Sequence, residues 1–252
     1  MLLARLWLDG GGMVSFEELC GWFGGLDGVV VAFSGGVDSS VLAAAARSAL
    51  GDGAVAVTVR SELQSGRDLS NARRIAAEIG IEHAILEMSI LDLDEVRMNL
   101  ATRCRLCKRA MAGGLLSFAR SRGMEVVVDG TNASDREEDR PGMRSLLEAG
   151  IRMPLRELGI SKEEVREMAR DLGLSSADLP SRSCLAPRIE GPISPERLRR
   201  VEAAEELLPL GWKVSDREDW IEVLIPRGER LSEDAIRGLK RLGYGEVIPV
   251  ED

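Results

Sequence analysis

The sequence predicts an α/β fold in which helices cover both faces of a doubly wound parallel sheet, followed by a small α+β appendage. Two observations support this prediction. Short runs rich in valine and alanine, typical of fully buried strands, alternate with helix-like segments along the first 175 residues. Beyond a polar, proline-bearing segment, helices and strands follow one another without that regular alternation. The second part is therefore expected to form a separate, smaller layer.

In the first part, each expected strand is followed by an expected helix. We expect strands at 29–33, 54–59, 82–87 and 125–129, and helices at 38–50, 68–79, 105–122 and 161–172. Such an order makes the strands parallel, and ligands of parallel sheets bind at the carboxyl ends of the strands. This places Ser34, Arg60 and Gly130 on one rim.

Changes in composition divide the chain into four parts. Residues 1–14 are expected to be a tail, 15–175 the α/β domain, 176–193 an irregular functional loop, and 194–252 the small α+β domain. Within the last part we expect helices at 194–208 and 232–242 and strands at 220–225 and 246–250. A further helix is expected around Cys20, which is most simply a small buried residue.

Composition narrows the possible functions. The 252 residues, 44% hydrophobic and 30% charged, contain no apolar run near the ~20 residues that span a bilayer, and Arg5 and Asp9 interrupt the first segment. We therefore expect no membrane partner and a cytoplasmic location. A net charge of −9 makes nucleic acid an unfavourable partner. The single histidine, His83, excludes histidine triads and multi-histidine metal sites, and is expected to be structural.

The strongest motif lies after the first strand, where Ser34-Gly35-Gly36-Val37-Asp38-Ser39-Ser40 leads into an alanine-rich helix. Backbone N–H groups of such a turn converge at the positive end of the helix dipole and favour a phosphate group. Glycine allows close approach, and serine adds hydroxyl donors. No lysine follows the glycines, which disfavours a Walker-type loop. The alternative is an ordinary strand-to-helix turn.

Cysteine is the second informative residue type. Structural disulfides are unexpected in a cytoplasmic protein, so metal binding or sulfur chemistry becomes a stronger explanation for the cysteines. Cys104 and Cys107 form a C-x-x-C pair, which alone is a weak signal, and a cysteine placed like Cys184, in the irregular loop, is by itself more often incidental than catalytic. Arg182 and Arg188 flank Cys184, and their positive charge is expected to lower the pKa of its thiol and to attract an anionic substrate.

Four motifs in this order resemble the LarE family of ATP-dependent sulfur transferases. They are the Ser34–Ser39 motif, 104–108 (CRLCK), 129–135 (DGTNASD) and 180–189 (PSRSCLAPRI). The resemblance implies the PP-loop fold of the ATP pyrophosphatases, an adenine nucleotide alpha hydrolase-like fold. It also implies that the chain uses ATP and Mg²⁺ to adenylate a carboxylate of pyridinium-3,5-biscarboxylic acid mononucleotide. Pyrophosphate leaves, and sulfur then enters to form a thiocarboxylate for the nickel-pincer nucleotide cofactor.

The resemblance leaves two routes for the sulfur. In the favoured one, Cys104, Cys107 and Cys184 hold a 4Fe-4S cluster, and three thiolate ligands leave one iron open to carry sulfide. In the other, Cys184 gives up its own sulfur and becomes dehydroalanine, while the pair is structural or holds zinc. The physiological sulfur donor is not indicated.

Site residues follow from the motifs and the resemblance. Cys184 is the expected catalytic residue, and Asp38 the expected Mg²⁺ ligand, although Asp38 could instead serve only as an acid at the helix N-terminus. The expected ATP-binding residues are Ser34, Gly35, Gly36, Asp38, Ser39, Ser40, Gly130, Thr131 and Asn132. The expected substrate-binding residues are Lys108, Asp135, Arg182 and Arg188, with Arg140, Arg144 and Arg217 as weaker candidates.

Three other functions are compatible with parts of the pattern. A tRNA-thiolating enzyme would use the same thiols, but the acidic charge disfavours it. An amide-forming synthetase that uses ammonia would not need Cys184, and a nucleotide-sensing module would release no pyrophosphate. Homo-oligomerisation is expected from the resemblance alone, and the match is poorest at 212–219, where relatives carry a basic strand with histidine.

Overall fold

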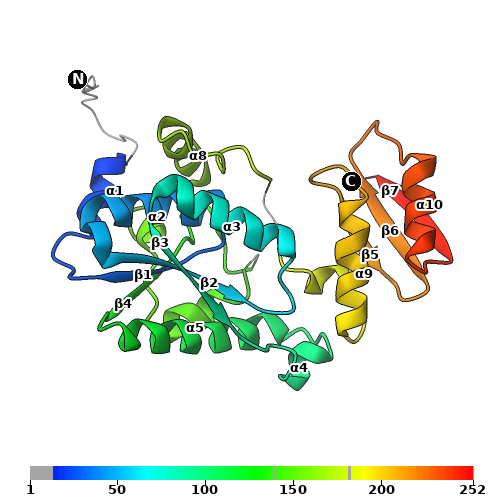
Figure 1. Cartoon of the computed structure of the whole chain (residues 1–252), viewed down its shortest axis with the longest axis horizontal. Helices are drawn as coiled ribbons and strands as arrows, with labels where there is room; N and C mark the ends of the chain where they lie inside the picture. The colour runs from blue at the N-terminus through cyan, green and yellow to red at the C-terminus, as the bar shows by residue number, and fades with distance from the viewer. Residues whose placement is uncertain (1–13, 139, 181–182, 252) are drawn as a thin grey trace.

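The computed structural model describes residues 14–138, 140–180 and 183–251 (Figure 1). Its main sheet contains β1 (Val29–Ala32), β2 (Ala54–Arg60), β3 (Glu82–Glu87) and β4 (Val126–Asp129), in the order β3-β2-β1-β4. All neighbouring strands are parallel. The predicted parallel α/β sheet is thus confirmed, and the segments after β1 and β4 leave adjacent strands at one edge of the sheet.

Helices cover both faces of this sheet. One face packs on α1 (Phe16–Trp22), α2 (Val37–Leu50), α3 (Gly66–Ile79) and α8 (Lys162–Asp171). The other face packs on α5 (Arg103–Ser121) and α6 (Met143–Glu148). Successive strand residues point to opposite faces, so that Val29 and Val31 join the first core while Val30 joins the second. Because both faces are buried, the strand reads as a continuous apolar run.

Several short elements did not stand out in the sequence. They are α4 (Asp94–Arg97), α6, α7 (Pro154–Glu157), the 3₁₀ turns η1 (Gly51–Gly53) and η2 (Ala186–Arg188), and strand β5 (Lys213–Asp216). Elements of three to six residues are too short to establish a hydrophobic period. The longer elements lie within a few residues of their predicted bounds.

The C-terminal unit has α+β order: α9 (Pro195–Glu206), β5, β6 (Trp220–Ile225), α10 (Glu233–Arg241) and β7 (Glu246–Glu251). Strand β6 pairs antiparallel with β5 and parallel with β7. Asp216, at the end of β5, is fully buried and accepts hydrogen bonds from Arg197, Arg200 and Tyr244. These bonds join β5 to α9 and to the turn between α10 and β7. Burial alone would raise the pKa of Asp216, but these bonds hold it below its ordinary value.

The segment 176–193 joins the two parts: Ala177 packs in the core of the α/β domain, whereas the residues from Leu185 to Ile193 contribute to the core of the C-terminal unit. Leu185 and Ile189 pack in that core together with Leu63 and Ile90, which follow β2 and β3. Backbone bonds reinforce the contact, because Leu185 N donates to Leu63 O at 2.8 Å. The core therefore runs across the predicted boundary at 193–194, and the domain limits stay a prediction. The expected tail lies almost entirely outside the described residues.

None of the helices in the described part of the chain combines the length and the apolar character that a membrane crossing requires.

His83 is a packed residue of β3. Its ring meets Phe33 edge to face at 5.6 Å, and its Nε2 lies 2.8 Å from Thr58 Oγ1. The Thr58 hydroxyl already donates its single proton to Phe33 O, so His83 Nε2 is the donor to Thr58. Burial, assisted by the charge of Arg73, lowers the pKa of His83. The imidazole is thus held neutral, as a structural residue would be.

Stability should consequently fall when His83 is protonated. Because the folded-state pKa is below the unfolded one, the unfolded chain binds more protons as pH falls through about 6.5, and folding loses free energy. We expect the melting temperature to drop between pH 7.5 and 5.5, a window above the ordinary pKa values of Asp and Glu. His83→Gln, whose amide can still donate to Thr58, should flatten that dependence. An unchanged slope in the variant would contradict this assignment.

Candidate functional site

The loop between β1 and α2 has the form of an anion-binding turn. Gly36 is the N-cap of α2 and offers no side-chain cap, so the first N–H groups of the helix remain available. The Ser34 and Ser39 hydroxyls lie 3.1 Å apart, and Gly36 N donates to Ser34 Oγ at 3.2 Å. These hydrogen bonds hold residues 34–39 in a compact turn. The geometry suits a phosphate group at the positive end of α2.

Two glycines allow close backbone contacts around this loop. Gly35 has φ +72°, and a Cβ there would lie 2.7 Å from Ala72 Cα in α3. At Gly130, a Cβ would lie 2.8 Å from Ser39 N and 3.1 Å from the Asp38 carbonyl carbon. The segment after β4 therefore rests directly on the first turn of α2. The motifs at 34–40 and 129–135 are thus in contact at one rim of the sheet, where their positions after β1 and β4 placed them.

Asp38 lies between two polar groups from distant segments. Its Oδ1 accepts from Asn132 Nδ2 at 2.9 Å, and its Oδ2 accepts from Lys162 Nζ at 2.6 Å. Lys162 was not among the predicted site residues, since the sequence indicates only a helix start at Ser161. Its ammonium lies where a Mg²⁺ ion bound to Asp38 would compete with it, so the Mg²⁺ role of Asp38 stays a prediction.

Thr131, Asn132 and Asp135 shape the loop that follows β4. Thr131 and Asn132 are 1% exposed, and both the N–H and the hydroxyl of Thr131 donate to Asp129 Oδ1. Asp135 Oδ2 accepts from Asn132 N, and its other oxygen pairs with Arg140 at 2.8 Å. These side chains are therefore engaged within the protein. Their predicted contacts with ATP and substrate stay predictions.

The three thiols converge. Cys104 and Cys107 lie in the first turns of α5, and Cys184 approaches them from the loop before α9. Burial raises the pKa of the Cys107 thiol to about 11; Lys108 opposes this, while Cys184 and Cys104 add to it. Cys104 likewise raises the pKa of Cys184. Each thiol thus lies within electrostatic range of the other two.

The prediction that arginines make Cys184 acidic is wrong. Cys184 is an exposed residue, yet many protein atoms surround its thiol, and this desolvation raises its pKa against the opposing Ala186 N–H, Lys108 and Arg188. Arg188 is itself 7% exposed, with Nε donating to Glu205 at 2.9 Å. Its guanidinium also donates to Ser183 and positions the loop. The substrate role of Arg188 stays a prediction, and Arg182 lies outside the described residues.

Lys108 is placed between the thiols and the loop before α6. It lowers the pKa of both Cys107 and Cys184. A Cβ on Gly142 would lie 2.4 Å from Lys108 Cγ, so the loop rests directly on this side chain. Of the weaker candidates, Arg144 pairs with Glu148, and Arg217 is held between Glu190 and Glu222.

Within residues 14–138, 140–180 and 183–251, no three His, Cys, Asp or Glu side chains are arranged to hold a metal ion. Cys104, Cys107 and Cys184 lie within electrostatic range of one another, but among the described residues they do not adopt a ligating arrangement. The predicted cluster is not shown.

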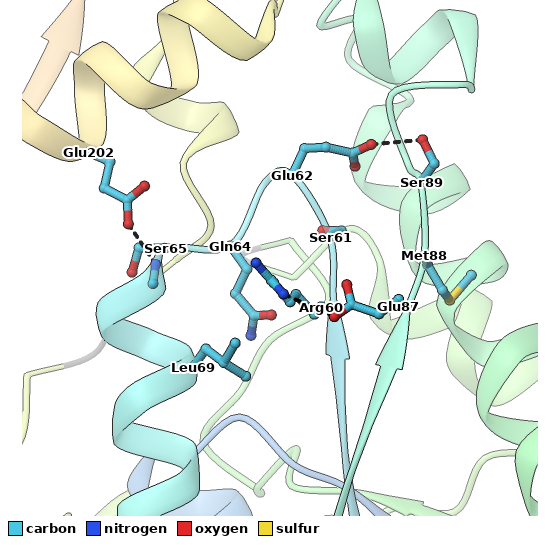
Figure 2. Close-up of a pocket in the computed structure, with 11 residues that line it drawn as sticks. Arg60, Ser61, Glu62, Gln64, Ser65, Leu69, Glu87, Met88, Ser89 and Glu202 are labelled. Atoms are coloured by element: carbon cyan, nitrogen blue, oxygen red, sulfur yellow. Dashed lines mark hydrogen bonds and ion pairs between the residues drawn. The ribbon is translucent and has the colours of Figure 1, made fainter.

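A cavity of about 660 Å³ lies at the carboxyl ends of β2 and β3. Figure 2 shows the residues that line it, with Glu202 of α9 on one side. Arg60 pairs with Glu87 at 3.0 Å, and Glu202 accepts from Gly66 N at 2.6 Å. Glu62 accepts from Ser89 and Ile90 N, and its charge raises the pKa of Cys107. The buried Gln64 Oε1 has no partner among the described residues. Glu62 thus brings one wall of the cavity within electrostatic range of Cys107. Of the residues that line the cavity, the sequence had placed only Arg60 on this rim.

The close contact at Gly130 yields a test of the nucleotide site. In Gly130→Ala, the methyl group would press on Ser39 N and displace the first turn of α2, so ATP affinity should fall by about tenfold. Gly113→Ala is the matched control, because its Cβ meets nothing within 4 Å. Isothermal titration with Mg-ATP measures both. Equal affinities in the two variants would show that ATP binds elsewhere.

Comparison with known proteins agrees with this geometry. The family model described as asparagine synthase matches residues 28–130. Uncharacterized protein slr1717 of Synechocystis is 38% identical, over 75% of this chain and 71% of that protein. Pyridinium-3,5-bisthiocarboxylic acid mononucleotide synthase of Lactiplantibacillus plantarum is 30% identical, over 73% of this chain and 67% of that protein. A tRNA-specific 2-thiouridylase MnmA of Bradyrhizobium is 34% identical, but over 60% of this chain and 47% of that protein.

The phosphate loop at the carboxyl end of a parallel sheet, the three thiols near one another at the same end, and the extent of these likenesses lead to one family. The chain belongs to the LarE family of ATP-dependent sulfur transferases, enzymes of the PP-loop fold.

Proposed function

We propose that this enzyme adenylates a carboxylate of a pyridinium mononucleotide and replaces one of its oxygen atoms with sulfur. The observation that carries the proposal is the gathering of three thiols at the sheet edge that also holds the uncapped phosphate loop. A kinase or an amide-forming ligase needs no such thiols. The identity of the acceptor rests on the L. plantarum relative, whose name specifies a pyridinium bisthiocarboxylic acid mononucleotide.

The chemistry proceeds in two displacements. A carboxylate oxygen attacks the α-phosphorus of ATP, the bond to the β-phosphate oxygen breaks, and pyrophosphate leaves. A sulfur nucleophile then attacks the carbonyl carbon of the acyl adenylate, and AMP leaves with the former carboxylate oxygen. The product is a thiocarboxylate. ATP is consumed because a carboxylate oxygen is a poor leaving group, whereas AMP is a good one.

The cavity beside Arg60 is suited to the acceptor. Its volume of about 660 Å³ is within the range of small-molecule sites. One of its lining residues, Glu62, lies within electrostatic range of Cys107. Arg60 can exchange its partner Glu87 for an anionic group of the substrate. Glu62 and Glu202 also line the cavity, and the hydrogen bonds described above reach them from neutral donors. Their negative charge therefore favours a positively charged ring.

Lys162 is proposed to bind the phosphate groups of ATP and to stabilise the departing pyrophosphate. Its ammonium lies 2.6 Å from Asp38 Oδ2, beside the first turn of α2, so a small rotation would bring it to an anion in the phosphate loop. Asp38 would then be released to hold Mg²⁺. Negative charge builds up on the departing pyrophosphate, and a fixed cation at that point lowers the barrier.

Lys162→Met should therefore reduce turnover more than folding stability. We expect acceptor-dependent pyrophosphate–ATP exchange to fall by about a hundredfold to a thousandfold, the usual effect of removing one group that stabilises the charge of the transition state. Lys240→Met, in the last turn of α10, is the control and should exchange at the wild-type rate. The proposal fails if wild-type enzyme shows exchange with tRNA but none with pyridinium carboxylates.

For sulfur delivery we propose that Cys104, Cys107 and Cys184 hold a 4Fe-4S cluster. When bound, such a cluster with three protein ligands can carry an added sulfide at its fourth iron. The raised pKa of Cys107 and of Cys184 keeps these thiols protonated near neutral pH, so cluster binding must expel their protons. The second candidate, loss of sulfur from Cys184 itself, is favoured by its exposure and by the absence of a ligating arrangement among the described residues.

The two routes give different results for the cysteines. On the cluster route, anaerobically reconstituted protein should contain about four iron and four sulfide per chain, and Cys104→Ala, Cys107→Ala and Cys184→Ala should each lose most of both. Cys20→Ala, remote on α1, is the control. If instead the protein stays free of iron and intact-mass analysis shows one sulfur lost per product, Cys184 is the donor. Only that variant of the three should then abolish sulfur transfer.

A further inference from the structure

Asn71 of α3 contacts the phosphate loop from outside. Its side-chain amide Nδ2 donates to Gly35 O at 3.0 Å. The neighbouring Ala72 is the residue on which Gly35 packs, at a separation that admits no Cβ. The sequence offers no motif at Asn71, because the contact joins residues 36 positions apart.

This hydrogen bond fixes the direction of one peptide group. In a trans peptide, the carbonyl of Gly35 and the N–H of Gly36 point in opposite directions. Asn71 holds the carbonyl on the α3 side, and the Gly36 N–H accordingly points inward, where it reaches Ser34 Oγ at 3.2 Å. Since Gly35 has φ +72° and both residues are glycine, the peptide could turn over with little steric cost. A turned peptide would present its carbonyl oxygen to the bound phosphates.

The orientation of the Asn71 amide is itself fixed. Arg74 donates to Asn71 Oδ1 at 2.6 Å, which leaves Nδ2 directed at Gly35. Arg74 also pairs with Glu78 at 2.6 Å, and Glu78 accepts from Ser175. Burial would raise the pKa of Glu78, but the bonds from Ser175 and the charge of Arg74 lower it, so the carboxylate stays ionised and holds Arg74.

We propose that Asn71 is a positioning residue that keeps the Gly35–Gly36 peptide with its N–H toward the pyrophosphate part of ATP. The inference rests on the proposed use of ATP, but not on the acceptor or on the route of the sulfur. It assigns to α3 a part in nucleotide binding, although no side chain of that helix belongs to the phosphate loop.

Isosteric replacement tests this directly. In Asn71→Asp, the carboxylate cannot donate to Gly35 O and would instead accept from the Gly36 N–H of a turned peptide. Titration calorimetry should show Mg-ATP and inorganic pyrophosphate binding about tenfold more weakly, as expected when one hydrogen bond to a charged group is lost. AMP, which lacks the pyrophosphate, should lose less than twofold. Asn71→Ala should lie between Asn71→Asp and the wild type.

Ser70→Ala is the matched control, because Ser70 is the adjacent exposed residue and its hydroxyl donates only to Gly66 O of its own helix. It should bind all three ligands as the wild type does. A merely structural role for Asn71 predicts the reverse order, with the truncated Ala variant worse than the isosteric Asp variant, and an equal loss for AMP; that result would overturn the proposal. Wild-type protein that binds no ATP would refute the proposed function instead.

Discussion

The close approach of Gly130 to the first turn of α2 is the contact on which the site depends. Because β1 and β4 are adjacent and parallel, the segments that leave their carboxyl ends meet, and only glycine lets one backbone rest on the other. That contact brings Asn132 to Asp38, and Asp38 in turn holds Lys162 of α8. Three separate segments thereby surround one point at the positive end of α2. Phosphate binding is thus a property of how the strands are ordered as much as of the serine–glycine loop.

The sequence predicted what is local and missed what depends on distant contacts. The phosphate loop, the buried strands and the long helices each carry their signal within about a dozen residues. Lys162 and Asn71 do not, since their importance comes from partners 124 and 36 positions away. The charge argument for Cys184 failed for the same reason. Arg188 was close in sequence, but it is committed to Glu205 of α9, and desolvation then decides the pKa of the thiol.

Desolvation raises the pKa of two of the thiols, Cys107 and Cys184, and this suits sulfur transfer in two ways. Neutral thiols pack beside one another at little electrostatic cost, whereas three thiolates with Lys108 nearby would repel one another strongly. Loss of the thiol protons would therefore accompany binding of a metal cluster, which supplies positive charge, or reaction with an electrophile, which forms a bond to the sulfur. The raised pKa of Cys107 and Cys184 also slows oxidation of these thiols when the site is idle, because oxidation acts on the thiolate form. Raised pKa values are thus compatible with a sulfur site that is activated only when loaded.

The pairing of Arg188 with Glu205 explains how an exposed cysteine can be placed reproducibly. Both side chains are 8% exposed, and a buried ion pair of this kind contributes little net stability relative to apolar residues of the same size. Breaking the pair would leave one buried charge without a partner, at a cost of about 3–5 kcal/mol. The pair therefore fixes the position of Arg188 relative to α9. Arg188 also holds Ser183 and the carbonyl of Cys184, while Leu185 is bonded to Leu63 after β2. The loop is thereby tied to α9 on one side and to the sheet edge on the other. The position of Cys184 therefore rests on contacts with both parts of the chain, which also share one hydrophobic core.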